Sequence, residues 1–405
     1  MKANIHTIAI EAESIADNNT ITGIGRMIVN YIARITALEN SKFNFDIISM
    51  NHNAFVPHGL AHCRKSEILE ILKEAAKNNK FGFLIMRFVN NYWRISAFSK
   101  TLKLLVQGII LWYISYKRKF DLLIQTNPSI PTLFMPRRVR LMVFVHDYVW
   151  FRNRGLTEGY TFLARWAMIK SIKNADVIIT VSDYIKYETE KYFNKKNVFS
   201  IKNAAEPELF FPVGEGEIDS VRGKYSIHKP YILSVCTLEP RKNLSTLIRA
   251  YAQLEGRELY NLVLTGMSGW KNKDIFATIE RLGVAENIIF TGYVPNDDLR
   301  GLYSGALMFV YPSLYEGFGL PVLEAMQCGC PVIISNTSSL PEVAGDAGIM
   351  VAPDDITGFR DAMETLAADS SLRDTLRKKG ITRAATFSWD KSFQMLMDSI
   401  QSLYD

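Results

Sequence analysis

Short apolar runs alternate with amphipathic segments along most of this chain, a pattern typical of an α/β fold. In the first half, strands are predicted at Thr7–Glu11, Asp121–Gln125, Leu141–Val145, Val177–Val181 and Asn197–Ile201. In the second half, they are predicted at Tyr231–Cys236, Leu262–Leu264, Ile288–Thr291, Leu307–Tyr311, Pro331–Ser335 and Ile349–Val351. Because helical segments separate most of these strands, we expect parallel sheets.

A chain of 405 residues is too long for one ordinary core and predicts two domains. Residues 202–217 lack periodicity and carry two prolines in the first part, which is typical of an interdomain linker. We therefore expect one Rossmann-like domain at residues 1–210 and a second at 211–388, followed by an apolar helix at 389–405.

One stretch, residues 307–335, predicts a complete βαβ unit. A strand to Tyr311 is followed by a helix over Pro321–Cys328 and a second strand from Pro331. The loop Pro312–Leu320 then lies at the carboxyl end of a parallel strand, where open α/β sheets bind ligands.

The residues of this loop indicate what the ligand is. Gly317 and Gly319 allow close backbone approach, and the N-terminus of the following helix attracts anions. The carboxylates of Glu316 and Glu324 are suited to hydroxyl groups. Phosphate and polyol together indicate a nucleotide sugar; the alternative is that both acids only complement a helix dipole.

Arg241 and Lys242 follow a strand at the corresponding position. Two adjacent cations at a helix N-terminus oppose the helix dipole, so helix stability does not explain them. A bound diphosphate would explain the two cations, because arginine can bind it bidentately and lysine supplies a point charge. The alternative is a pair of solvated surface charges.

The spacing Glu316-x7-Glu324 within EGFGLPVLEAMQCGCPVI resembles the signature of the retaining glycosyltransferases of family 4. This resemblance implies the GT-B fold, two Rossmann-like domains that face each other across a cleft, with the C-terminal helix packing back on the first domain. It implies that Glu316 holds sugar hydroxyls and Glu324 holds the nucleotide ribose. The backbone of Phe318, Gly319 and Leu320 would meet the diphosphate or the sugar, and EPRKN resembles the family's diphosphate-binding loop.

Further donor-binding positions come from the same resemblance. Gly23 and Gly25, before a helix predicted to begin at Arg26, resemble the glycine loop of the first GT-B domain. Val294 would bind the base through its backbone. His146, after a strand, would contact the transferred sugar, and we consider Asp147 as the group that orients its ring or as a cap. Without the resemblance, Gly23 and Gly25 are typical of a flexible turn before a helix. His146 is then typical of a core histidine whose hydrogen bonds are made within the protein.

Cofactors and compartment follow from composition and from absent motifs. The four cysteines form no paired framework, which favours a reducing cytosol. We read Cys328 and Cys330 as small buried residues and predict no metal site, because no DxD motif stands at a strand end. The donor would therefore be bound without a metal or another cofactor. The longest uncharged apolar run, Leu104–Tyr116, is too short to span a membrane, which takes about 20 residues.

Residues 75–120 carry nine lysines and arginines, many aromatic residues and no Asp or Glu. This composition is typical of a segment that lies on an anionic membrane surface. We therefore expect a cytoplasmic enzyme that contacts the inner face of the membrane here. A solvated basic face over core helices is the alternative; nucleic acid is the third reading, without any module signature.

The segments TGIGR, TLEPRKNL, GMSGWKN and YEGFGLPVLEAM most resemble bacterial mannosyltransferases of surface polysaccharide synthesis. The resemblance implies transfer of a hexose, mannose from GDP-mannose, to a lipid-linked or polysaccharide hydroxyl. The alternatives are a UDP- or dTDP-sugar donor, a sugar-nucleotide epimerase or hydrolase, a pyridoxal-dependent phosphorylase, and a non-catalytic nucleotide-binding protein.

Overall fold

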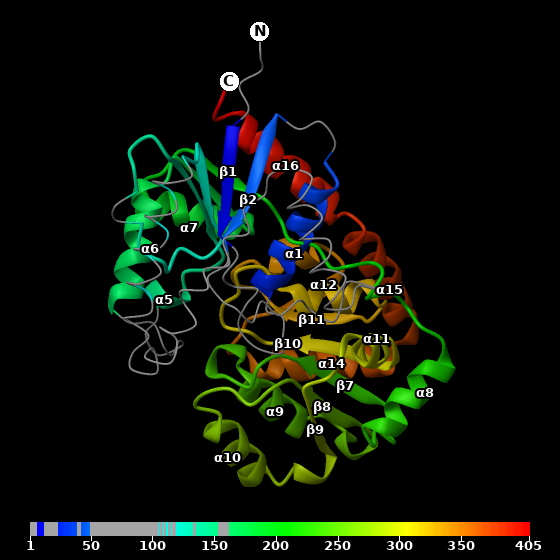
Figure 1. Ribbon diagram of the computed structural model, residues 1–405. Helices are drawn as coiled ribbons and strands as arrows, with labels where there is room; N and C mark the ends of the chain where they lie inside the picture. Colours follow the sequence, from blue (N-terminus) through cyan, green and yellow to red (C-terminus); the bar gives the residue numbers. More distant parts are fainter. Residues whose placement is uncertain are drawn as a thin grey trace, which may run out of the picture. The chain divides into compact units, whose positions relative to one another are not determined.

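The computed structural model describes residues 6–11, 23–38, 42–48, 119–132, 135–152 and 162–405, with four single positions at 104, 108, 111 and 115. The chain divides into two compact units (Figure 1). Unit 1 comprises residues 1–154, 159–201 and 390–405, and unit 2 comprises residues 155–158 and 202–389. Each unit holds one six-stranded sheet, and this confirms the predicted α/β class.

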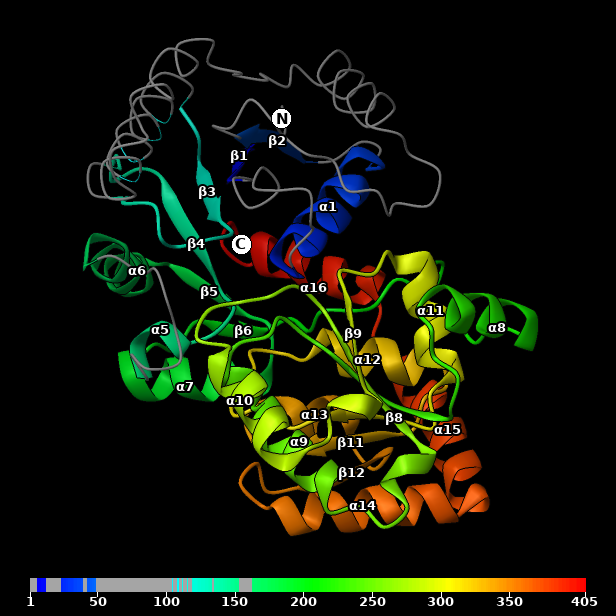
Figure 2. The ribbon, with the colours of Figure 1, turned by 90° about the horizontal axis from the view of Figure 1, so that it is seen from below.

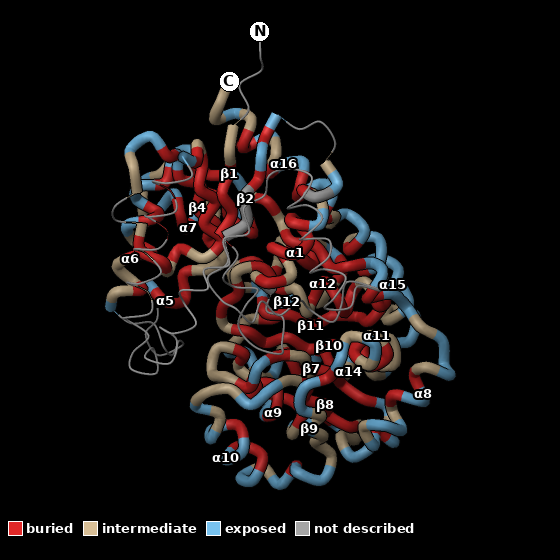
Figure 3. Tube along the Cα trace, in the orientation of Figure 1, coloured by how far each residue is buried: buried red, intermediate tan, exposed pale blue. Residues whose placement is uncertain are grey.

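Unit 1 is built on a sheet with the order β2-β1-β3-β4-β5-β6, in which every described pairing is parallel. Its strands are β1 (His6–Glu11), β2 (Phe43–Ile48), β3 (Leu122–Gln125), β4 (Arg140–Val145), β5 (Val177–Thr180) and β6 (Val198–Ser200). Its described helices are α1 (Gly23–Thr36), α5 (Val149–Arg152), α6 (Phe162–Asn174), α7 (Asp183–Phe193) and, from Asp390 on, α16 (Trp389–Gln401). Strands β3, β4 and β5 are mostly apolar and almost wholly buried, as expected for a parallel sheet covered on both faces. Figure 3 shows the buried β4 in red.

The end of the chain packs within unit 1. The rings of Tyr31 in α1 and Phe393 in α16 are 6.3 Å apart, and Arg34 Nε lies 2.8 Å from Asp390 Oδ1. The Tyr404 ring stacks on His6 in β1, with 3.9 Å between centroids. Helix α16 therefore lies beside α1.

Unit 2 repeats the plan with the order β12-β11-β10-β7-β8-β9, again with parallel pairings. Its strands are β7 (Tyr231–Val235), β8 (Asn261–Thr265), β9 (Ile288–Gly292), β10 (Met308–Tyr311), β11 (Val332–Ser335) and β12 (Gly348–Val351). One helical layer holds α9 (Leu244–Ala252), α10 (Lys273–Leu282) and α14 (Ile356–Ala368); another holds α8 (Glu215–Lys224), α11 (Asn296–Gly305), α12 (Leu320–Gln327) and α15 (Ser370–Ala384) (Figure 2). The short helix α13 (Leu340–Ala344) packs on α12.

The strand order of unit 2 reverses direction at β7. From β7 the chain runs through β8 to β9 on one side, and β10 returns to pair with β7 on the other before β11 and β12 extend the sheet. The loops after β7 and β10 therefore meet at a topological switch point, the place where such sheets bind ligands.

Some boundaries differ from the sequence-based prediction. Helix α1 begins at Gly23 and not at Arg26, so Gly23 and Gly25 form its first turn and not a preceding loop. The helical spacing of apolar residues extends back to Ile24, which explains the earlier start. Helix α8 begins at Glu215, inside the predicted linker, where two acidic residues favour a helix N-terminus.

Strand β2 and helix α6 are among the elements that were not predicted. Strand β2 is an edge strand that pairs with β1 alone. Helix α6 buries a stripe formed largely by small residues, Ala164, Ala167, Met168, Ser171 and Ile172, and Ala and Ser give only a weak apolar signal. The basic and aromatic segment 75–120 lies almost entirely outside the described residues. Within the described part of the chain, no helix is long and apolar enough to cross a membrane.

Gly266, directly after β8, provides a test of how closely the strand ends of unit 2 pack. Its φ is +138°, and a Cβ there would overlap the backbone carbonyl of Cys236 after β7. We expect Gly266→Ala to lower the free energy of unfolding by roughly 3 kcal/mol, because backbone must move and the conformation is strained. Urea denaturation followed by circular dichroism measures it.

Gly223→Ala is the matched control. Gly223 lies in α8, and a Cβ there would meet nothing within 4 Å. This change should leave stability unchanged or raise it by up to about 1 kcal/mol, because alanine favours a helix. Equal stability of the two variants would contradict the close approach of β7 and β8 at Gly266.

Candidate active site

The candidate active site of unit 2 lies where the loops after β7 and β10 meet. The first loop runs from Cys236 through a 3₁₀ turn at Pro240–Lys242, and the second runs from Pro312 to Gly319. They are joined directly, because the N–H of Leu314 donates to the carbonyl of Arg241 at 2.9 Å.

Asn243 ties these loops together. It adopts a left-handed conformation, with φ of +55°, between the 3₁₀ turn and α9. Its side-chain amide donates to the carbonyl of Pro312 at 3.0 Å and to that of Pro353 at 2.6 Å. Asparagine is one of the few residues that tolerates this backbone and can also bridge two carbonyls.

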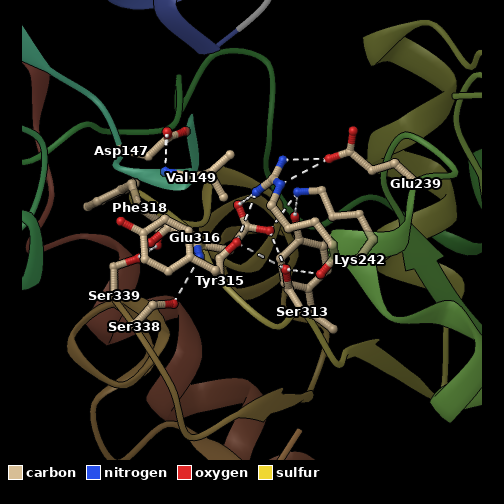
Figure 4. Close-up of polar contacts among 12 residues, drawn as sticks. Asp147, Val149, Glu239, Lys242, Ser313, Tyr315, Glu316, Phe318, Ser338 and Ser339 are labelled. Carbon is tan, nitrogen blue, oxygen red and sulfur yellow. Dashed lines mark hydrogen bonds and ion pairs between the residues drawn. The ribbon is translucent and has the colours of Figure 1, made fainter. Parts of the chain in front are cut away.

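Glu316 is the centre of a buried ion cluster (Figure 4). Its Oε1 lies 2.6 Å from Lys242 Nζ and accepts the Ser313 hydroxyl at 2.6 Å. Its Oε2 lies 2.9 Å from a terminal nitrogen of Arg241. Glu316 is 7 % exposed and Lys242 is 8 % exposed, so this contact is largely shielded from water.

The cluster keeps Glu316 ionised. Burial by itself would raise the pKa of this carboxyl, but Arg241, Lys242 and the hydrogen bonds outweigh it and lower the pKa to about 2. Tyr311 completes the cluster, since its hydroxyl accepts from Lys242 Nζ at 2.6 Å. Burial and the charge of Glu316 hold the pKa of Tyr311 well above its ordinary value, so it stays a neutral phenol.

Glu239 holds the other side of Arg241. A single oxygen of Glu239 accepts from Nε at 3.0 Å and from a terminal nitrogen at 2.7 Å. The remaining guanidinium nitrogen donates to Glu316 and to the carbonyl of Tyr315. The ion cluster therefore has two positive side chains, Arg241 and Lys242, and two negative ones, Glu239 and Glu316. The guanidinium plane of Arg241 is held by a carboxylate on each side.

The loop that carries Glu316 is fastened to residues after β11. The N–H of Glu316 donates to the Ser338 hydroxyl at 2.9 Å. The Ser339 hydroxyl lies 3.0 Å from the carbonyl of Glu316 and 2.7 Å from that of Phe318. The loop ends at Gly319, whose φ is +115° and which starts α12 without a side-chain cap. No side chain caps the N–H groups at this end of the helix, so they can bind an anion.

Four further residues of unit 2 were predicted as site residues. Glu324 is buried in α12, and its Oε2 accepts the hydroxyl of Tyr303 at 3.1 Å. Val294 is buried just after the edge strand β9, two strands from β7. Phe318 is buried and Leu320 is the first residue of α12.

Gly23, Gly25 and His146 belong to unit 1. His146 follows β4, and its Nε2 lies 2.8 Å from the carbonyl oxygen of Thr126. Burial lowers the pKa of His146 to about 4, although the hydrogen bond to Thr126 acts in the opposite direction. The Asp147 carboxylate accepts the N–H of Val149 at 3.1 Å, which is the capping role considered in the sequence analysis. The hydrogen bond that orients the His146 ring goes to Thr126 and not to Asp147.

Sequence reasoning missed Glu239, Tyr311 and Ser313 in the cluster of unit 2, and Thr126 beside His146 in unit 1. Glu239 alone had a local signal, because it stands two residues before Arg241 at a strand end. Cys236, Cys328 and Cys330 are free thiols buried in unit 2, as the sequence predicted for the last two. Among the described residues, no group of three or more His, Cys, Asp or Glu side chains is placed to hold a metal ion.

Comparison with known proteins identifies the family. Residues 218–383 match the profile of the family described as glycosyl transferases group 1. The chain is 37 % identical over 269 residues to the O-antigen chain mannosyltransferase B of Escherichia coli. This alignment covers 64 % of this chain and 70 % of that protein. It is 34 % identical over 284 residues to the E. coli serotype-specific mannosyltransferase WbdA, covering 68 % of this chain and 35 % of that longer protein.

A likeness in structure supports the fold. The Anabaena protein Alr3699/HepE, solved in complex with UDP and glucose, aligns with a TM-score of 0.70 at 15 % identity over 98 % of this chain and 100 % of that one. This likeness confirms the GT-B fold expected from the sequence. The family profile and the E. coli relative that is 37 % identical show that the chain belongs to the group 1 glycosyltransferases.

Proposed function

We propose that this glycosyltransferase moves mannose from GDP-mannose to a hydroxyl of a lipid-linked or polysaccharide acceptor, in the synthesis of a bacterial surface polysaccharide. The observation that carries the proposal is the buried cluster of Arg241, Lys242 and Glu316 beside the start of α12. The choice of mannose is supported by the two E. coli mannosyltransferases to which the chain is similar.

The cluster has unused capacity for a sugar diphosphate. Lys242 Nζ has three N–H groups, and two are directed to Tyr311 and Glu316. The third can bind a phosphate oxygen. Oε2 of Glu316 accepts from Arg241, and a carboxylate oxygen has about two acceptor positions, so Oε2 can also accept a sugar hydroxyl.

The remaining contacts complete the proposed donor site. Glu324 holds the ribose, the backbone at Val294 holds the base, and the backbone of Phe318, Gly319 and Leu320 meets the diphosphate or the sugar. In unit 1, Gly23, Gly25 and His146 contact the donor.

The proposed reaction needs no enzyme nucleophile. The bond from the sugar C1 to the diphosphate oxygen breaks, and the acceptor oxygen forms a new bond to C1 on the same face, so the configuration is retained. The acceptor proton passes to the departing diphosphate. Arg241, Lys242 and the N-terminus of α12 stabilise the charge that develops on the diphosphate.

Lys242→Ala tests the role of the cluster in turnover. We expect kcat/KM for the donor to fall by about tenfold or more, because the leaving group loses a cation in a water-poor site. Initial rates with purified enzyme measure it. Lys379→Ala is the matched control, since Lys379 pairs with Asp346 at an exposed position of the same unit. A near-normal kcat/KM of the Lys242 variant would remove this lysine from the mechanism.

Donor choice is tested by thermal shift against GDP-mannose, UDP-glucose, UDP-N-acetylglucosamine and dTDP-rhamnose. A donor present at 100 times its Kd stabilises the folded protein by about 2.7 kcal/mol. We expect GDP-mannose to give the largest rise in Tm and GDP a smaller one. A larger rise with a UDP- or dTDP-sugar would replace the proposed donor.

Product analysis with the donor alone separates the rival activities. Free mannose without acceptor would indicate a hydrolase, and an altered sugar nucleotide would indicate an epimerase. Binding without any turnover in the presence of acceptor would support a non-catalytic nucleotide-binding protein.

Metal dependence follows from the charges at the site. Because Arg241, Lys242 and the start of α12 supply the positive charge for the diphosphate, we expect initial rates in excess EDTA to stay within about twofold of the untreated rate. Restoration of a lost activity by Mg²⁺ or Mn²⁺ would show that a metal shares this task.

A further inference from the structure

The carboxyl ends of β1, β3 and β4 in unit 1 are joined by a chain of hydrogen bonds from Glu11 through Thr126 to His146. Strand β1 stands between β2 and β3, so the direction of the sheet reverses there and β1 and β3 flank a switch point. Glu11 is the last residue of β1, and Thr126 directly follows β3. This second switch point of the protein thus carries a buried acid that the family signature does not include.

Glu11 fastens the start of the turn after β3. Its side chain is 0 % exposed. The Thr126 hydroxyl lies 2.8 Å from the backbone oxygen of Glu11 and 3.0 Å from Glu11 Oε2. The hydroxyl proton of Thr126 is therefore shared between these two oxygens of Glu11. The N–H of Asn127 also donates to Oε2, at 3.1 Å. One carboxylate therefore holds two successive residues of the turn.

Two further bonds make this turn rigid. The side-chain oxygen of Asn127 accepts the N–H of Ser129 at 3.2 Å. The side-chain amide of Gln125 donates to the carbonyl of Ile130 at 2.8 Å. The carbonyl group of Thr126 is consequently fixed in position by bonds on both sides of it.

This carbonyl decides where the proton of His146 resides. Nε2 of the ring lies 2.8 Å from the Thr126 oxygen, and a carbonyl oxygen only accepts, so Nε2 carries the proton. In a neutral ring, Nδ1 is then an acceptor without a proton. Nδ1 makes no hydrogen bond to the described part of the chain, and the His146 side chain is partly exposed. A sugar hydroxyl, which can donate a proton, is the type of group that suits it.

We infer that Glu11 and Thr126 are positioning residues for His146: they hold the Thr126 carbonyl so that the ring presents a bare Nδ1 lone pair to a hydroxyl of the transferred sugar. The inference rests on the proposed function for the sugar contact. The statement that Nε2 of His146 carries the proton concerns the protein without a bound donor and does not depend on the proposed function.

The test measures the His146 tautomer by NMR of ¹⁵N-histidine-labelled full-length protein, and donor kinetics in parallel. His146→Gln identifies the signal among the six histidines. In the wild-type protein, the Nε2–H tautomer should dominate. Thr126→Val removes the hydroxyl and keeps the shape; we expect the second tautomer to appear and kcat/KM for the donor to fall roughly tenfold. Glu11→Gln should act in the same direction.

Thr180→Val is the matched control. Thr180 ends β5, is 0 % exposed, and its hydroxyl lies 3.1 Å from the carbonyl of Ser182. This variant loses a comparable buried hydroxyl and should keep the wild-type tautomer and kinetics. Thr126→Ser restores the hydroxyl and should restore both readouts. If Thr126→Val does not fold, Glu11→Gln and Thr126→Ser provide the comparison.

A wild-type ring protonated on Nδ1 would overturn the inference, as would a wild-type tautomer in both Thr126→Val and Glu11→Gln. A changed tautomer with unchanged kcat/KM would overturn the sugar contact while the positioning of the ring stands. If thermal shift selects another donor, the kinetic comparison uses that donor, so an error in the choice of GDP-mannose leaves this test intact.

Discussion

The chemistry of unit 2 depends on one electrostatic constraint: two adjacent cations lie at a place that is mostly shielded from water and need a negative charge beside them. Glu316 meets this constraint for both Arg241 and Lys242, with contacts of 2.9 and 2.6 Å. Removing one partner of such a buried group costs about 3–5 kcal/mol, because the remaining charge is left without compensation. The site is therefore assembled before any ligand arrives, and a bound diphosphate would add to an existing charge balance instead of creating one.

The loops around the cluster serve this balance. Asn243 joins the loop after β7 to the loop after β10, and Ser338 and Ser339 fasten the latter to the segment after β11. Three strand ends are thus held together by hydrogen bonds to backbone groups. Side chains at the switch point can then be small or charged, since the position of the backbone does not depend on their packing.

The sequence predicted the residues with a local pattern and missed those defined by distant partners. Arg241, Lys242 and Glu316 follow apolar strands, so their shared location was predictable from the parallel topology. Tyr311 contacts Lys242 across 69 positions of sequence, and nothing in its own neighbourhood indicates that contact. For His146, adjacency suggested Asp147 as the orienting group, whereas the structure uses Thr126, 20 residues earlier. The strands other than β2 were found because parallel strands are continuous apolar runs. Helix α6 was missed because small residues form most of its buried stripe.

The ionisation of the site restricts how a proton can move in the reaction we propose. With its pKa held at about 2 by two cations, Glu316 is a poor base at neutral pH, and any proton it took would break its ion pairs with Arg241 and Lys242. Lys242 is a donor, and Tyr311 is a neutral phenol whose pKa lies far above neutrality. Of Glu316, Lys242 and Tyr311, none is therefore suited to accept the acceptor's proton. The departing diphosphate, which gains negative charge as the C1–O bond breaks, is the base that the chemistry of the reaction itself supplies.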